Sequence, residues 1–379
     1  MFTERIYNFS AGPSMLPEEV LQKAASELLN YGGTGTSVME MSHRSKNFLA
    51  IFEETKSLLK AIMNVPDSHE ILFLQGGASM QFSMIPLNLI GKTGKADYAI
   101  TGNFSKLATK EAKRYGEINI AADTEDENNT YIPRQADLKL SGDASYFHYC
   151  ANNTIYGTEW DYVPETGDAP LVCDMSSNIL SKPMDVSKYG IIYAGAQKNM
   201  APAGLTAVII DKALIGQEME RTPTMLSYKT QVEKDSMYNT PPTYNIYMLG
   251  LVLKWIEAKG GLLGMVKYNE EKAKILYDYL DESTLFKGCA RPDARSLMNV
   301  TFVTGDTELD ASFAKEAEAR GLSNLKGHRN VGGMRASIYN AMPMEGLQTL
   351  VAFMKKFETK HCEKIEKGKY NNVSNQNPQ

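Results

Sequence analysis

The stretch Tyr193-Ala-Gly-Ala-Gln-Lys-Asn199 is the part of the sequence on which the prediction of fold and function depends. Residues 189–193 before it have the bulk of a strand buried in a parallel sheet. A Pro- and Gly-rich turn and a second apolar run follow it. Lys198 is therefore expected in a tight turn beside buried strands. Desolvation lowers the pKa of an ammonium group, and a neutral amine can form a Schiff base with an aldehyde cofactor. On this stretch alone, a solvated loop lysine is the alternative.

Composition restricts the class of protein. The chain has 379 residues, 43% of them hydrophobic, and a net charge of −5 with interspersed signs. This favours a large α/β domain with a second, smaller one, and it gives no electrostatic footprint for nucleic acid or an anionic membrane. The four cysteines form no CxxC or zinc pattern, and no apolar run reaches the length of a membrane span. We expect a cytoplasmic globular protein without a metal site.

Strands and helices alternate along the first two thirds of the chain. Apolar runs at residues 70–74, 97–101, 117–121, 146–150 and 170–174 are each followed by a turn, and several of these turns lead into a helical pattern. Such alternation predicts a mostly parallel central sheet flanked by helices, in which ligands bind beyond the carboxyl ends of the strands. Phe104, Thr154, Asp174 and Lys198 all fall at such ends.

The turn at residues 75–79 is a candidate phosphate site. It contains Gly77, Ala78 and Ser79 and lies between a strand and a helix expected over residues 80–89. This arrangement directs backbone N–H groups and the positive end of a helix dipole at one point. It has neither the Walker nor the G-x-G-x-x-G spacing, and an ordinary strand–helix connection is the alternative.

We expect two domains and a tail. A large domain over residues 16–260 would carry the parallel sheet, and a smaller α+β domain would combine residues 1–15 with 261–362. The polar, Asn-rich residues 363–379 are expected to be disordered. Helices are expected at residues 18–31 and 344–360, among others, and residues 8–13 read as an irregular loop.

These features together fit pyridoxal 5′-phosphate. Lys198 would hold the aldehyde, Asp174 would pair with the ring nitrogen, and Phe104 would stack on the ring. Thr154 could bond the ring hydroxyl, and the turn after residue 75 would take the phosphate. Arg335 offers a fork to an α-carboxylate, and His43, Arg44, His328 and Arg329 are cations suited to a phosphate ester. The alternatives are a solvated turn at residues 43–44 and a solvated basic loop at residues 326–335.

The sequence closely resembles the phosphoserine aminotransferases, which are class V, fold-type I pyridoxal-phosphate enzymes. The resemblance covers nearly the whole chain except the tail. The motifs that carry it are Met41-Ser-His-Arg44, Gly76-Gly-Ala-Ser-Met-Gln-Phe82, Asn152-Asn-Thr-Ile-Tyr-Gly157, Gly195-Ala-Gln-Lys-Asn199, Asn239-Thr-Pro-Pro242 and Gly327-His-Arg329.

The resemblance implies reversible amino transfer from glutamate to 3-phosphohydroxypyruvate, giving phosphoserine and 2-oxoglutarate in serine biosynthesis. It makes Lys198 the cofactor-linked lysine and proton carrier, and it places Gln197 near the cofactor phosphate. It also implies a homodimer with shared sites. Asn239 and Thr240 would reach the neighbour's cofactor phosphate, while His43 and Arg44 would serve the neighbour's substrate phosphate.

Two departures from the family pattern concern affinity rather than reaction type. Many members have a tryptophan where this chain has Phe104, and a smaller ring without an N–H donor is expected to hold the cofactor less tightly. Some members have an arginine where Ser79 and Met80 stand here, which leaves one cation fewer for the substrate phosphate.

Three alternatives remain open. Another class V aminotransferase would act on a non-phosphorylated small amino acid and would not need so many cations. A cysteine desulfurase would need a reactive cysteine on a mobile loop, and Cys289 and Cys362 lack such surroundings. A nucleotide-binding or scaffold protein on the same sheet would bind no chromophore and would tolerate the loss of Lys198.

Overall fold

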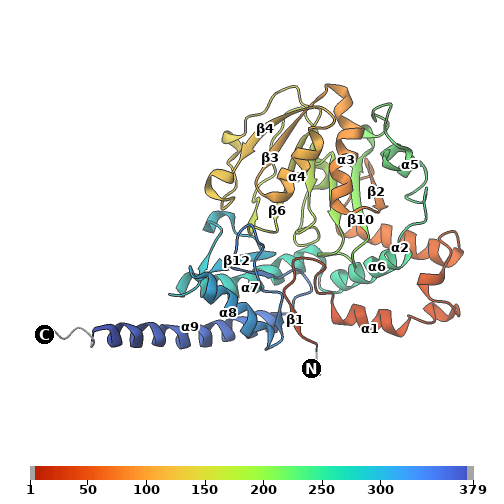
Figure 1. The fold of residues 1–379 in the computed structure, drawn as a ribbon. Coiled ribbons are helices and arrows are strands. Elements are labelled where there is room, and N and C mark those ends of the chain that lie inside the picture. Colours follow the sequence, from red (N-terminus) through yellow and green to blue (C-terminus); the bar gives the residue numbers. More distant parts are fainter. Residues whose placement is uncertain (1–4, 374–379) are drawn as a thin grey trace.

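A seven-stranded sheet forms the centre of the computed structural model, which describes residues 5–373 and the side chains up to residue 361 (Figure 1). All of its strands run parallel except β10, which is antiparallel to both neighbours. The mostly parallel sheet predicted from the sequence is confirmed. In spatial order the strands are β2 (His69–Leu74), β10 (Thr206–Asp211), β9 (Ile191–Gly195), β8 (Leu171–Asp174), β5 (Phe147–Cys150), β3 (Lys95–Ile100) and β4 (Glu117–Asp123).

Both faces of this sheet are covered, which explains why its strands are apolar without alternation. Along β2, Ile71 and Phe73 join one apolar cluster and Leu72 and Leu74 join the other, as the two-residue period of a strand requires. The first cluster contains residues of α1 (Glu18–Ser26), α2 (Lys46–Ile62) and α6 (Thr243–Ala258). The second contains residues of α3 (Gly77–Leu89), α4 (Asn103–Ala112) and α5 (Tyr228–Glu233).

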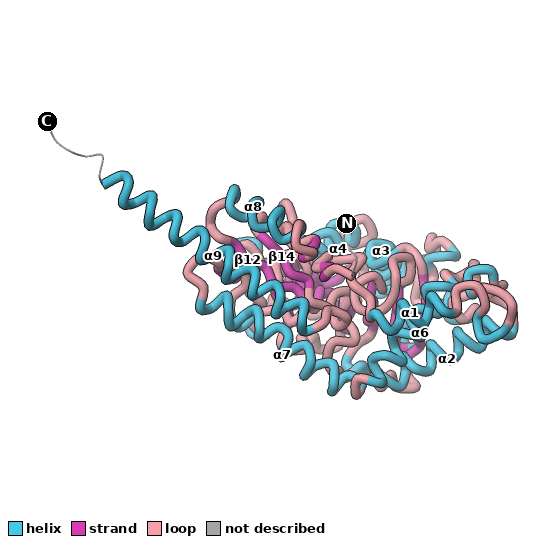
Figure 2. Tube along the Cα trace, turned by 90° about the horizontal axis from the view of Figure 1, so that it is seen from below, coloured by secondary structure: helices cyan, strands magenta, loops and turns pink. Residues whose placement is uncertain are grey.

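A separate apolar cluster is formed by Phe9 and by residues of the last third of the chain. The helices and strands of that last third lie together in Figure 2. Its three-stranded antiparallel sheet consists of β11 (Lys287–Gly288), β12 (Asn299–Val303) and β14 (Met334–Ser337). Helices α7 (Gly261–Glu282), α8 (Thr307–Glu318) and α9 (Met344–Val373) pack on it. The N-terminal β1 (Tyr7–Asn8) pairs in parallel with β13 (Leu322–Ser323), so the two ends of the fold meet.

Helix α7 belongs to both parts. Leu262 and Met265 lie in the cluster of the large sheet, whereas Ala273 and Leu276 lie in the cluster of the smaller one. The domain boundaries at residues 15/16 and 260/261 stay a prediction, because this helix has no break between the two cores. A short antiparallel pair, β6 (Asn152–Asn153) and β7 (Thr158–Glu159), follows β5.

Two expected segments differ in the structure. Helix α1 ends at Ser26 rather than at residue 31, because Asn30 accepts a hydrogen bond from the Gly35 backbone (2.7 Å) and turns the chain. The tail expected to be disordered from residue 363 is helical up to Val373, as a continuation of α9. Extending an existing helix is much easier than starting one, and the Lys and Glu residues of this segment are good helix formers. Residues 374–379 lie outside the described part.

Within the described residues, no helix combines the length and apolar character needed to cross a membrane. The expected cytoplasmic location stays a prediction.

Phe286→Ala is expected to destabilise the smaller core. Phe286 is fully buried, and its ring centroid lies within 6.2 Å of those of Tyr279, Phe302, Phe313 and Phe357. Truncating such a side chain leaves a cavity and costs roughly 3–5 kcal/mol in the free energy of unfolding, measurable by urea denaturation. Leu263→Ala, at a side chain that is 68% exposed, is the control and should change it by less than about 0.5 kcal/mol. Equal effects of the two substitutions would contradict the assignment of Phe286 to the core.

Candidate active site

The register of the large sheet brings the predicted site residues to one edge. Leu74, the last residue of β2, and Gly195, the last of β9, both pair with Thr206. Asp174, the last residue of β8, pairs with Cys150 of β5 and with Tyr193 of β9. The carboxyl ends of these strands are therefore level, and the segments that follow them converge. Those segments carry Gly77, Ala78, Ser79, Thr154 and Lys198, and Phe104 follows β3 at the same edge.

Lys198 lies half-buried in the turn between β9 and β10. Its Nζ donates a hydrogen bond to Thr154 Oγ1 (2.7 Å) and lies 5.3 Å from the centroid of the Phe104 ring. Burial lowers the pKa of the Lys198 amine below its usual value, and the charge of Arg335 lowers it further, while Asp174 and Cys150 act in the opposite direction. The amine is therefore shifted toward the neutral form that reacts with carbonyl groups.

Asp174 is a buried carboxylate, and the Ser176 backbone N–H donates to its Oδ1 (2.9 Å). Burial raises the pKa of Asp174. Hydrogen bonds from Ser176, the charge of Lys198 and the hydroxyl of Tyr193 counteract this. A buried carboxylate with these partners is suited to pair with a protonated nitrogen.

The first turn of α3 forms a cradle for an anion. Gly76 precedes the helix with φ of 89°, and a Cβ at this position would lie 2.6 Å from Met80 Cβ. Only glycine fits there without strain. The first backbone N–H groups of a helix, here those of Gly77, Ala78 and Ser79, have no partner inside the helix and attract anions.

Asn239 and Thr240 lie beside this cradle, whereas the contacts of Gln197 are at the end of β9. The Gln197 side chain folds over Gly195, where an added Cβ would meet its Oε1 at 2.9 Å. The Thr240 carbonyl accepts a hydrogen bond from Gln75 Nε2 (2.8 Å), and Asn239 lines a small cavity with Gly76. Within one chain, Asn239 and Thr240 therefore already stand beside the turn that begins α3.

The predicted substrate cations divide into two groups. Arg335 of β14 has a buried Nε without a hydrogen-bond partner among the described residues, and burial lowers its pKa. Burial lowers the pKa of His328, and the charge of Arg335 lowers it further. The loop that carries His328 and the exposed Arg329 therefore lies near Arg335. His43 and Arg44 lie on the loop before α2, and no contact described within the chain joins them to Lys198.

The N-terminal loop contributes contacts that the sequence did not indicate. The Ser14 backbone N–H donates to the Gln197 carbonyl (2.9 Å), and its hydroxyl donates to the Lys198 carbonyl. A Cβ on Gly12, whose φ is 143°, would lie 3.3 Å from Lys198 Cγ. The adjacent Gly12 and Pro13 were the available signal, since glycine often marks a close approach of the backbone.

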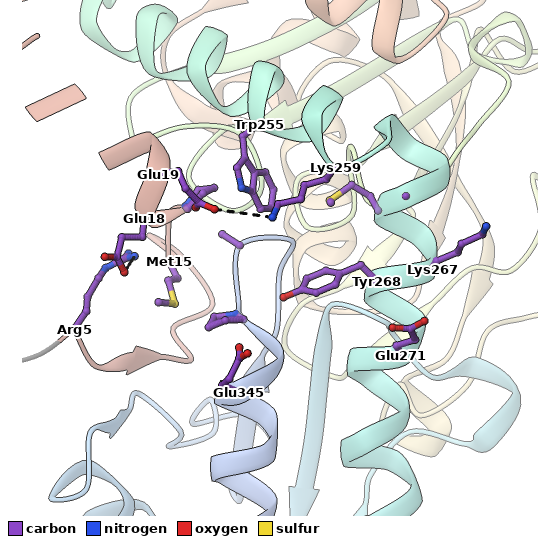
Figure 3. A pocket seen from close by; sticks show the side chains of 15 residues that line it. Arg5, Met15, Glu18, Glu19, Trp255, Lys259, Lys267, Tyr268, Glu271 and Glu345 are labelled. Atoms are coloured by element: carbon purple, nitrogen blue, oxygen red, sulfur yellow. Dashed lines mark ion pairs between the residues drawn. The ribbon is translucent and has the colours of Figure 1, made fainter. Parts of the chain in front are cut away.

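A cavity of about 520 Å³ lies elsewhere, between α1, the end of α6, the start of α7 and the start of α9 (Figure 3). Its lining includes Trp255, Tyr268 and Glu345, and an ion pair of 4.0 Å joins Lys259 to Glu19 at its rim. Its lining contains none of the predicted site residues.

Comparison with known proteins gives the family of this chain. The family model described as "Aminotransferase class-V" matches residues 6–350, so the chain belongs to the class V aminotransferases and is a transaminase. A protein of Nitrosomonas europaea called phosphoserine aminotransferase is 53% identical over 366 residues, which cover 94% of this chain and 100% of that protein. Within its class the chain is a member of the phosphoserine aminotransferase family.

Solved structures give the same result. Phosphoserine aminotransferase from Bacillus circulans subsp. alkalophilus superposes with a TM-score of 0.93 at 46% identity, covering 95% of this chain and 100% of that one. A pyridoxal-phosphate-bound phosphoserine aminotransferase from Trichomonas vaginalis has a TM-score of 0.89 at 43% identity, covering 93% and 100%. The predicted fold-type I architecture is confirmed.

The pH at which Lys198 becomes reactive is expected to lie below that of an exposed lysine. Its pKa is lowered, so the neutral amine forms at lower pH, whereas a hydrogen bond to Glu125 raises the pKa of Lys106. Acylation of the cofactor-free protein across a pH series, quantified by mass spectrometry, should give a lower midpoint for Lys198 than for Lys106. The midpoint, unlike the absolute rate, does not depend on how accessible each amine is. Coincident midpoints would contradict the prediction.

Proposed function

We propose that this aminotransferase uses pyridoxal 5′-phosphate to transfer an amino group reversibly between glutamate and 3-phosphohydroxypyruvate, giving phosphoserine and 2-oxoglutarate. The observation that carries the proposal is the desolvated Lys198 amine beside Thr154, Phe104 and the buried Asp174. The names of the relatives supply the substrate.

The residues present fit this cofactor. Its aldehyde and ring hydroxyl are neighbours on the ring, and Lys198 Nζ and Thr154 Oγ1 lie 2.7 Å apart. The ring nitrogen is opposite the aldehyde, and Asp174 is a buried carboxylate electrostatically coupled to Lys198. The cradle at Gly77, Ala78 and Ser79 offers unpartnered N–H groups to a phosphate. When bound, the cofactor supplies an electron sink for charge that develops at the substrate's Cα.

The chain's own residues would bind, orient and move a proton. Lys198, once released from the cofactor, is placed to carry a proton to and from Cα, because its lowered pKa makes it a competent base. Asp174 would keep the ring nitrogen protonated. Phe104 would cover one face of the ring, and Gln197 would add a neutral donor near the phosphate.

The cations would then select the substrate. Arg335, whose Nε lacks a partner among the described residues, would bind the α-carboxylate common to all four substrates. His328 and Arg329 would bind the phosphate of phosphoserine. We propose a homodimer with shared sites, in which His43 and Arg44 of the neighbouring subunit complete this phosphate site. Asn239 and Thr240 stand beside the α3 turn of their own chain, and in the proposed dimer they would reach from there to the neighbour's cofactor phosphate. In the single chain His43 and Arg44 have no described contact with Lys198, and a dimer would give them this role.

Lys198→Ala is expected to abolish the cofactor's lysine-linked absorbance. The purified wild-type protein should be yellow, and the variant should lose this band and its transaminase activity, because no other described amine contacts Thr154. The absorbance spectrum measures this directly. Lys106→Ala, at an exposed lysine on α4, is the matched control and should keep the band. An unchanged lysine-linked spectrum in Lys198→Ala would refute the assignment.

Arg329→Ala is expected to lower kcat/KM for phosphoserine much more than kcat/KM for glutamate. Losing a charge-assisted contact to a phosphate costs on the order of 2–4 kcal/mol when substrate and neighbouring subunit cover the group. The measurement is kcat/KM with phosphoserine, serine and glutamate as amino donors, followed by the change in cofactor spectrum. Wild type should prefer phosphoserine to serine, and Lys326→Ala, an exposed cation of the same loop, should keep this preference. Equal losses for phosphoserine and glutamate would favour a non-phosphorylated substrate.

A further inference from the structure

A row of buried polar side chains runs across the large sheet beneath Asp174. Asp174 of β8 pairs with Cys150 of β5 and with Tyr193 of β9, and His148 lies two residues before Cys150. Because side chains alternate along a strand and paired residues share a face, His148, Asp174 and Tyr193 project from the same face of the sheet. This face is covered by α3 and α4, so the row is shielded from solvent.

His148 makes two direct contacts in this part of the sheet. His148 Nε2 and the Tyr193 hydroxyl lie 2.9 Å apart, and both residues are almost fully buried, with 1% and 0% of their surface exposed. Tyr193 is the strand neighbour of Asp174 on the same face of the sheet, and its hydroxyl favours the ionised form of that carboxylate. The Tyr98 ring stacks on the His148 ring, with centroids 4.7 Å apart and planes inclined by 21°. The imidazole is therefore held in one orientation.

The position of each proton follows from these partners. Burial lowers the pKa of His148 to about 3 and raises that of Tyr193, so both groups are neutral near pH 7. The Tyr193 hydroxyl has one proton, and an ionised carboxylate can only accept. A hydroxyl turned toward Asp174 therefore has its lone pairs left to accept from His148 Nε2–H. His148 Nδ1 is then a bare acceptor. It is buried without a partner among the described residues, which costs less for a lone pair than for an N–H group.

We propose that His148 is a positioning residue for Asp174. Through the hydroxyl of Tyr193 it fixes the direction of the hydrogen bond to the carboxylate and keeps Asp174 an ionised acceptor facing the ring nitrogen of the bound cofactor. This inference rests on the proposed function. Sheet packing alone does not explain the residue, because an apolar side chain in this cluster would avoid an unpartnered buried nitrogen.

The test compares two ligands in equilibrium binding to the cofactor-free, full-length protein. One is pyridoxal 5′-phosphate, and the other is its carbocyclic analogue, in which C–H replaces the ring nitrogen. His148→Leu should raise the dissociation constant of pyridoxal phosphate about tenfold, the size expected when a hydrogen bond to a charged group is lost. The analogue's constant should change less than about twofold, because it has no ring nitrogen to pair with Asp174.

Three further single variants and one double variant separate positioning from folding. Tyr193→Phe should reproduce the selective loss of affinity for pyridoxal phosphate. The double variant with His148→Leu should bind pyridoxal phosphate no more weakly than either single variant, since both substitutions interrupt one chain of hydrogen bonds. His148→Gln keeps an N–H donor and should restore most of the affinity. Tyr98→Phe removes a buried hydroxyl that bonds Tyr146 (2.8 Å) rather than Asp174, and should show no selective loss.

The outcomes are distinct. A similar loss for both ligands, or no loss for either, would overturn the inference and leave the proposed function intact. If His148→Leu does not fold, Tyr193→Phe and His148→Gln decide the question in the same assay. If wild-type protein bound pyridoxal phosphate no better than the carbocyclic analogue, the role proposed for Asp174 itself would be wrong. If it bound neither ligand, the proposed function would fall.

Discussion

The whole site depends on keeping one amine and one carboxylate out of water at the same edge of a sheet. Neither Lys198 nor Asp174 would be buried for the sake of stability, because removing a charge from water is unfavourable unless a partner compensates it. The structure compensates only in part. Thr154 accepts a hydrogen bond from the Lys198 amine, and Ser176 donates one to the Asp174 carboxylate. Burial still shifts the pKa values of Lys198 and Asp174 toward their neutral forms. This incomplete compensation leaves the two groups ready to engage a ligand that carries the complementary functions.

Much of this arrangement could be predicted from the sequence, for a physical reason. Strands buried on both faces must be apolar throughout, so β9 and β10 were recognisable around Lys198, and parallel strands end at one edge, so Thr154, Asp174 and Lys198 had to converge. Family motifs then added the substrate. The two inferences about the strands use local sequence together with a general rule of sheet geometry. They do not require knowledge of distant contacts.

The features that the sequence did not indicate all depend on contacts between distant segments. Ser14 and Gly12 reach the Lys198 turn because β1 is paired with β13, more than 300 positions away in sequence. The hydrogen bond between His148 and Tyr193 depends on the order β5, β8 and β9, which alternation cannot reveal. The end of α1 and the length of α9 were misjudged because a single side-chain bond at Asn30 and the continuation of an existing helix outweigh composition.

Strand β10 has a mechanical consequence. Through Thr206 it is bonded in register to the ends of both β2 and β9, and so it acts as a fixed spacer between the anion cradle and the lysine turn. Sliding one relative to the other would break a ladder on each side at once. Whatever movement a catalytic cycle demands must therefore come from the bound molecule tilting and from loops outside this spacer, such as residues 327–333. The register thus fixes the separation of the two anchor points, and the scaffold sets the length of ligand that can bridge them.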